Sequence, residues 1–97
     1  MTSADIGPGV SINDARTYAW DGTTGLVEGR PDLRICYFKG LGDAKSRRLE
    51  VWVPMAYAIQ IEQETDTTLP LAKRNTYQIK HLVRDYHAAS VHDVTPD

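Results

Sequence analysis

The sequence predicts an α+β domain, with antiparallel β-strands in the first half followed by two α-helices, the last one long and amphipathic. Three observations predict this class. Residues 33–39 and 47–53 are rich in β-formers. The residues that follow Pro54 are good helix formers. Residues 71–90 place apolar side chains on one side of a helix and basic side chains on the other.

The chain has 97 residues, which is enough for one domain with a modest core. Residues 1–14 are rich in turn formers and predict a flexible N-terminal arm, so residues 15–97 form the single small α+β domain. No apolar run is long enough to span a membrane, and the first residues lack the features of a signal peptide. Cys36 is the only cysteine, which excludes an internal disulfide and favours a cytoplasmic location.

The first half contains one strong strand pair. Residues 33–39 predict the clearest strand, and residues 47–53 alternate apolar and polar side chains, as a strand with one buried face does. The two glycines between them favour a hairpin. Weaker strands are expected at 17–20 and 26–28, separated by turn residues.

Two helices are expected in the second half. Pro54 suits a first helical position, and propensity favours a helix at 54–65. A further strand is the alternative there, because Tyr57, Ile59 and Ile61 alternate. The last helix begins at Pro70 or at Thr76 and is followed by a frayed tail at 91–97. Its apolar side would hold Ala72, Ile79, Leu82, Val83, Tyr86 and Ala89.

Basic residues are concentrated in two short segments. Residues 39–48 and residues 71–90 each carry a net charge of +3, and since the whole chain carries −2, the remaining residues sum to −8. On the last helix, the basic residues would form one stripe opposite the apolar side. The members of that stripe are Lys73, Tyr77, Lys80, Arg84 and His87.

This segregation predicts contact with a polyanion, because each Lys or Arg that meets a phosphate releases condensed counterions. A solvated helix face without a partner explains the stripe equally well. Trp52 could be a stacking residue or an aromatic side chain at the margin of the core. The candidate nucleic-acid-binding residues are Lys45, Arg47, Arg48, Trp52, Lys73, Arg74, Lys80 and Arg84.

Neither a catalytic residue, a cofactor nor a metal ligand is predicted. His81 and Asp85 have helical spacing, but no second ligand pair accompanies them. The apolar neighbours of Cys36 predict a buried thiol rather than a nucleophile. Acid–base chemistry would require a positioned pair such as His87 with Glu50 or Glu62, and a sequence cannot show that they meet.

Residues 47–89 resemble a ribbon-helix-helix domain. The similar parts are the alternating strand that ends at Pro54, the helix after it, and the motif "YQIKHLVRDY". The resemblance implies a homodimer in which strands of two chains pair and enter the DNA major groove, with Arg48, Glu50 and Trp52 facing outward.

The leading hypothesis is therefore a small, dimeric, non-catalytic nucleic-acid-binding regulator, of the kind that binds DNA and controls transcription. The alternative is a protein-binding module, such as an inhibitor, adaptor or assembly subunit, whose basic helix docks on an acidic partner. The third hypothesis is a small toxin-type ribonuclease. None of the three involves a membrane.

Overall fold

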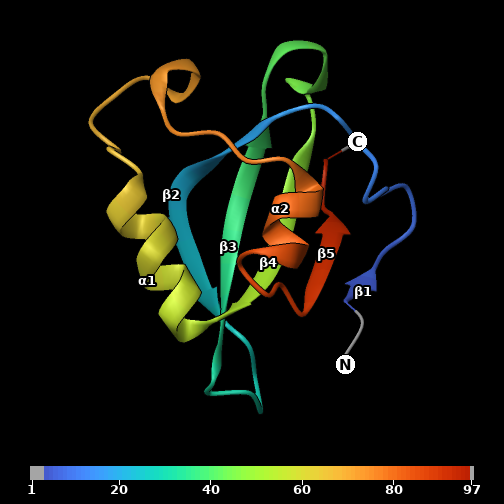
Figure 1. Cartoon of the computed structure of the whole chain (residues 1–97), viewed down its shortest axis with the longest axis vertical. Coiled ribbons are helices and arrows are strands. Elements are labelled where there is room, and N and C mark those ends of the chain that lie inside the picture. Colours follow the sequence, from blue (N-terminus) through green and yellow to red (C-terminus); the bar gives the residue numbers. More distant parts are fainter. Residues whose placement is uncertain (1–3, 97) are drawn as a thin grey trace.

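A computed structural model of the chain, described here over residues 4–96, contains one five-stranded sheet. In space the strands follow the order β1-β5-β4-β3-β2; β1 and β5 are parallel, and all other neighbours are antiparallel (Figure 1). The strands are β1 (Asp5–Ile6), β2 (Tyr18–Leu26), β3 (Leu33–Gly40), β4 (Arg48–Pro54) and β5 (Ser90–Asp93).

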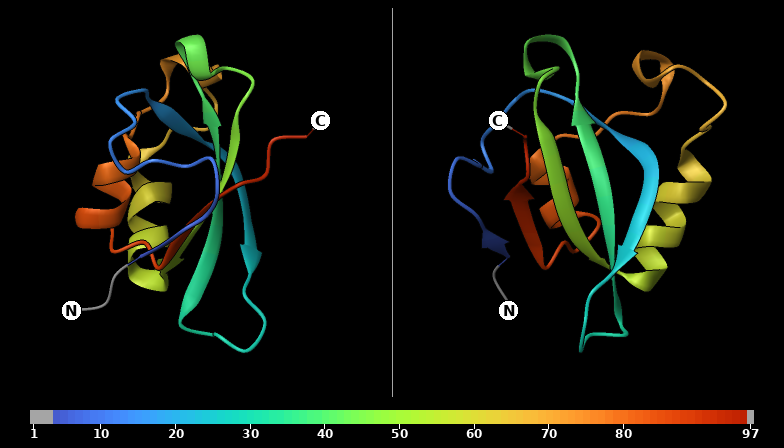
Figure 2. Two further views of the ribbon diagram at one scale, coloured as in Figure 1. Left: turned by 90° about the vertical axis from the view of Figure 1, so that its right-hand side faces the viewer. Right: turned by 180° about the vertical axis from the view of Figure 1, so that it is seen from behind.

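Both α-helices lie on one face of this sheet and leave the other face open (Figure 2). No helix in residues 4–96 is long and apolar enough to cross a membrane. The helical elements in chain order are η1 (Gly42–Ala44), α1 (Met55–Glu64), η2 (Leu71–Lys73) and α2 (Ile79–Arg84), where η marks a short 3-10 helix.

The core lies between the sheet and the helices. Side chains alternate along a strand, so Leu49, Val51 and Val53 of β4 all face the helices and are fully buried. Phe38 and Cys36 of β3 lie opposite Leu49 and Val51 and are also fully buried. The predicted α+β class, a sheet combined with separate helices, is confirmed.

The strand pair and the first helix are confirmed. β3 and β4 form the expected antiparallel hairpin, and η1 occupies the loop between them. A Cβ atom on Gly40 would lie 2.0 Å from the carbonyl oxygen of Ala44, so only glycine lets η1 fold back onto the end of β3. Residues 55–64 form α1 and not a further strand.

The prediction of a long last helix is wrong. α2 has six residues, and most of the segment before it is not helical. Tyr77 exchanges two backbone hydrogen bonds of 2.8 Å with Tyr18, and this pairing fixes residue 77 in an extended conformation. After α2 the chain reverses at His87, whose φ is +54°. Ile79 and Leu82 are fully buried as expected, whereas Val83 and Tyr86 are half-buried.

The predicted frayed tail at 91–97 is also wrong for residues 91–93, because β5 pairs with both β4 and β1. Val91 pairs with Val51 and is fully buried, so β5 contributes a side chain to the core. The strands are therefore neither all antiparallel nor all in the first half. Asp97 lies outside the described residues.

The resemblance to a ribbon-helix-helix domain is overturned by this topology. That family has a single short strand before two helices, whereas this chain has a five-stranded mixed sheet. β4, which would have been the ribbon strand, is paired on both sides within its own chain. It therefore has no free edge for a strand of a second chain.

The segment predicted to be a flexible arm contributes to the sheet. Within its described part, residues 4–14, Asp5 and Ile6 form β1 and pair with Ser90 and Val91. The flexibility of the arm and the boundary at residue 15 remain predictions, and residues 1–3 lie outside the described part.

Candidate functional site

Arg47, a candidate for nucleic-acid contact, is engaged inside the protein. Its guanidinium donates hydrogen bonds to the carbonyl oxygen of Gly9 at 2.8 Å and to the Asp93 carboxylate at 3.0 Å. It also lies 3.7 Å from the carboxylate of Asp14. These contacts tie the N-terminal segment to the loop before β4 and to the end of β5, which is a structural use of the charge.

Arg48 and Trp52 lie on the open face of the sheet and also have internal partners. The guanidinium of Arg48 stacks over the ring of Tyr37 at 4.7 Å and lies 3.6 Å from the carboxylate of Asp21. The indole N–H of Trp52 donates a 2.7 Å hydrogen bond to Glu50. Both groups therefore have a carboxylate partner within the chain, and their contact with a nucleic acid stays a prediction.

Arg74 holds the segment after α1 against the edge of the sheet. Its guanidinium donates hydrogen bonds of 3.0–3.1 Å to the backbone oxygens of Trp20, Thr67 and Leu69. These hydrogen bonds give the loop carbonyls the partners that regular secondary structure would otherwise supply, and they hold the loop in place.

The four remaining candidates have neither a hydrogen bond nor an ion pair from their side chains to any residue in 4–96. Lys45 and Lys73 are exposed beside η1 and in η2, which lie at the same end of the sheet (Figure 1). Lys80 and Arg84 lie on α2. Because η2 and α2 are separate elements, the single basic stripe predicted along one long helix does not exist.

The groups considered for catalysis do not form a reactive site. Burial, reinforced by the charges of Glu62 and Asp21, raises the pKa of the Cys36 thiol to about 12. The thiol therefore stays protonated and is a poor nucleophile. His87 packs its ring against Tyr57 at 4.8 Å. Within residues 4–96, no three His, Cys, Asp or Glu side chains are grouped so that they could hold a metal.

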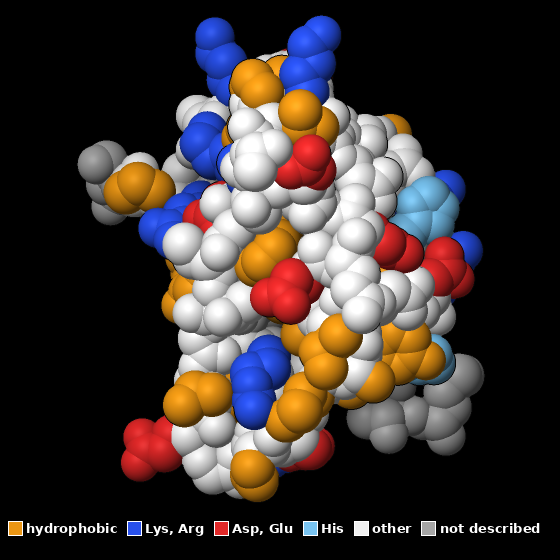
Figure 3. Space-filling view, turned by 90° about the vertical axis from the view of Figure 1, so that its left-hand side faces the viewer, with side chains coloured by type: hydrophobic (Ala, Val, Ile, Leu, Met, Phe, Trp, Pro, Cys, Tyr) orange, Lys and Arg blue, Asp and Glu red, His pale blue; other side chains and the backbone are white. Residues whose placement is uncertain are grey.

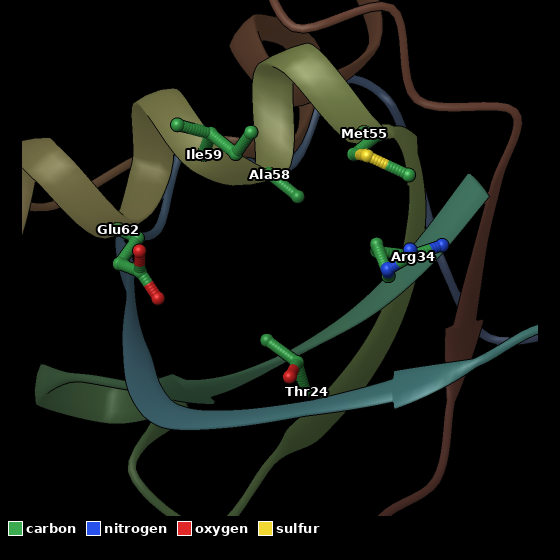
Figure 4. Close-up of a pocket in the computed structure, with 6 residues that line it drawn as sticks. All are labelled: Thr24, Arg34, Met55, Ala58, Ile59 and Glu62. Atoms are coloured by element: carbon green, nitrogen blue, oxygen red, sulfur yellow. The ribbon is translucent and has the colours of Figure 1, made fainter. Parts of the chain in front are cut away.

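A hollow lies between α1 and the sheet. It has a volume of about 230 Å³. α1 forms its roof, and side chains of β2 and β3 form its floor (Figure 4). We call it the α1–β2 groove, and its lining residues are Thr24, Arg34, Met55, Ala58, Ile59 and Glu62.

Large apolar side chains are exposed around this groove. Ile59 is 47% exposed and Met55 39% exposed, although both belong to a helix that packs on the sheet. Leu26, which pairs with Arg34 across β2 and β3, is 76% exposed. The space-filling view of this side shows hydrophobic side chains gathered around basic surface in its lower half (Figure 3). Exposed apolar residues that gather in this way mark interaction surfaces.

The two ends of the groove carry opposite charges. Arg34 lies at one end, under Met55, and Glu62 lies at the other (Figure 4). One guanidinium nitrogen of Arg34 donates hydrogen bonds to the carbonyl oxygens of Leu33 at 2.8 Å and Pro31 at 3.1 Å, which holds the side chain in place. Its other two nitrogens have no hydrogen-bond acceptor in residues 4–96, so they can take a carboxylate from outside.

The groove borders the part of β2 that the chain leaves uncovered. β2 is the outermost strand on its side of the sheet. Its first half is covered, since Tyr77 pairs with Tyr18 and Arg74 binds the Trp20 carbonyl. Residues 24–26 pair with β3, and their backbone makes no hydrogen bond outside strand pairing in the described structure. Their outward N–H and C=O groups are therefore available to another strand.

The chain matches no protein-family model, no curated protein and no solved structure. The groove must therefore be interpreted from its own geometry.

Sequence reasoning did not single out Leu26, Arg34, Met55 or Ile59. One signal was present: α1 carries apolar residues on more than one side, with Ala58 and Ile61 buried and Met55 and Ile59 exposed. A surface helix needs only one apolar face for its own core, so the apolar side chains on another side of α1 are more than the core requires.

Proposed function

We propose that the protein is a non-catalytic protein-binding module of the assembly-subunit kind, and that its docking surface is the α1–β2 groove. One observation carries the proposal. Of the four large hydrophobic side chains that are exposed in residues 4–96, Met55 and Ile59 line this groove, and Leu26 lies across the strand pair from Arg34, which also lines it. Covering them would remove apolar surface from water, which is the main driving force for association.

The surface has the composition of an interface centre with a polar rim. Met55 and Ile59 supply apolar contact area, and Arg34 and Glu62 supply the charges at the two ends. A methionine adapts its shape to a partner, and an arginine with free donors fixes the orientation of a carboxylate. This arrangement differs from the basic helix that the sequence suggested as the docking element.

A photo-crosslinking amino acid at Ile59 tests the proposal in an extract of the cells that produce the protein. We expect one specific adduct, lost when Met55 is changed to Glu, because a charge at the centre of an apolar interface opposes docking. The matched control places the same crosslinker at exposed Lys45, where no adduct is expected. No adduct at Ile59, or one that Met55→Glu leaves intact, would contradict the function.

A second candidate function, contact with a nucleic acid, is favoured by one observation. Lys45 and Lys73 come from segments far apart in the sequence, yet both lie at one end of the sheet. Lys or Arg side chains project from that end in the space-filling view (Figure 3). Neither lysine has a partner in residues 4–96, so both charges are available to phosphates.

Fluorescence anisotropy with a labelled duplex at two salt concentrations tests this second function. The double variant Lys45→Glu with Lys73→Glu should weaken binding to all sequences alike. The slope of the logarithm of the binding constant against the logarithm of the salt concentration should become less steep by roughly one unit for each lost phosphate contact. The matched control reverses Lys80 and Arg84 on α2. Wild-type protein that shows no binding at low salt would exclude the function.

A further inference from the structure

We infer that the occupant of the α1–β2 groove is a second copy of this chain, and that the two copies pair through residues 24–26 of β2 about a two-fold axis. The inference rests on the proposed function, because it names the partner of the same surface. Four features of the groove carry it: its charges, its apolar side chains, its open strand edge and the position of Gly25.

The charges at the ends of the groove are self-complementary. A two-fold axis that runs beside the middle of the groove, between the paired β2 strands, exchanges the ends of the groove, so the Arg34 end of one copy meets the Glu62 end of the other (Figure 4). Two Arg–Glu contacts form at once, and no like charges are opposed. This is the pattern that an isologous interface requires, because the same patch must complement itself. A helix-binding or strand-binding site for an unrelated protein has no such requirement.

The apolar side chains fit the same arrangement. When the strands pair edge to edge about an axis perpendicular to the sheet, both copies keep their helices on the same side of the joined sheet. The two α1 helices then flank the axis, and the exposed side chains of Met55 and Ile59 from each copy approach one another. Leu26, the most exposed large hydrophobic side chain, lies on the helix-bearing side of β2, since it shares a face with Arg34 and Thr24.

The uncovered edge of β2 has the length and position that pairing with a second copy of β2 requires. Tyr77 and Arg74 cover β2 up to Trp20, and Gly22 lies against Thr67, since a Cβ atom there would be 3.5 Å from the Thr67 methyl. Only residues 24–26 remain open, with Gly25 in the middle. Antiparallel pairing centred on Gly25 sets residue 24 of each copy opposite residue 26 of the other, and joins two five-stranded sheets into one.

Light scattering over a dilution series, with charge-reversal variants, tests the inference. We expect wild-type protein to be dimeric at high concentration. R34E should raise the dimer dissociation constant about tenfold or more, because it opposes two carboxylates across the axis, and E62R should do the same with two cations. Mixing the two monomeric variants should restore a heterodimer, since each mutated end then faces an opposite charge. L26K should also weaken the dimer.

The matched controls are K73E and D43R, which make the same charge changes at the other end of the sheet and should leave the dimer intact. Circular dichroism of each variant verifies that it is folded. Three results would overturn the inference: a monomeric wild type, a dimer insensitive to R34E and E62R, or two monomeric variants that do not associate when mixed.

These outcomes are distinguishable from failure of the proposed function. If the Ile59 crosslinker captures a different protein in a Met55-dependent manner and the purified chain is monomeric, the docking function stands and the second copy is excluded. An adduct of twice the chain's own mass supports both.

Discussion

The two outermost strands of the sheet, β1 and β2, are covered by the rest of the chain in different ways. On one side, β1 closes the sheet and Arg47 ties the N-terminal segment, β5 and the loop before β4 together through Gly9, Asp14 and Asp93. On the other side, β2 is covered only over its first half, and Leu26 and the α1–β2 groove border the uncovered half. The β1 edge is a two-residue strand beside which Arg47 fastens the neighbouring segments, whereas the β2 edge retains unpaired backbone groups beside apolar side chains.

This difference shows how the positive charge of the chain is used. Segregated basic residues suggested an external polyanion, yet Arg47, Arg48 and Arg74 bind acceptors within their own chain. Arg34, which lies outside both basic segments, keeps free donors, and Arg84 inside the second segment also has no side-chain partner in residues 4–96. Charge density along a sequence therefore does not identify the cations that remain available, because folding pairs some of them with distant carboxylates and carbonyls.

The largest expected effect is at Asp14, which lies on the segment that connects β1 to β2 and is the acceptor for several donors. Its carboxylate receives the backbone N–H and the guanidinium of Arg16 at 2.9 Å and the hydroxyl of Tyr18 at 2.7 Å, and its side chain is 6% exposed. The Arg16 hydrogen bonds, followed by that of Tyr18, outweigh burial and hold the pKa of Asp14 well below its usual range. Asp14→Asn should lower the free energy of unfolding by about 2 kcal/mol at neutral pH.

The pH dependence of this loss has a defined sign. Because the pKa of Asp14 is lower in the folded protein than in the unfolded chain, its contribution is complete above about pH 4 and is lost as the pH falls further. The wild type and Asp14→Asn should therefore converge in stability in acid, as measured by urea unfolding followed by tryptophan fluorescence. Asp85→Asn, at the exposed position directly after α2, is the control. A difference that stays constant down to acid pH would contradict this assignment.

The part of the fold that local signals determine was predictable. The alternation of residues 47–53 and the helix formers after Pro54 predicted the β3–β4 hairpin and α1, because side-chain periodicity and propensity act over a few residues. The segment around Tyr77 and the strand β5 were missed. Tyr77 is extended because it pairs with Tyr18, and Val91 is buried because Val51 lies beside it. Neither long-range partner can be read from the local pattern.

The candidate site was not predictable for the same reason. The α1–β2 groove depends on which side of α1 faces the sheet and on where the segment carrying Arg74 stops covering β2. Neither is encoded by a motif. The eight residues chosen from charge and aromatic character include none of the six that line the groove.

The smallest expected effect compares one glycine from each edge. A Cβ atom on Gly7, whose N–H donates to the Val91 carbonyl, would lie 2.8 Å from Cδ2 of His92, so Gly7→Ala must displace that ring from its edge-to-face contact with Trp52. On β2, a Cβ atom on Gly25 would meet Ile35 at an ordinary 3.5 Å.

We expect Gly7→Ala to lower the free energy of unfolding by about 1 kcal/mol. Gly25→Ala should raise it by about 0.5 kcal/mol, because alanine restricts the unfolded chain and its methyl group would make ordinary contacts with Ile35 and Tyr37 on the face of the sheet. Urea unfolding of both variants at one protein concentration, below that at which the wild type associates, makes the comparison. Equal losses of stability at the two positions would contradict the comparison, because they would show that a methyl group at residue 25 displaces its neighbours as much as one at residue 7 does.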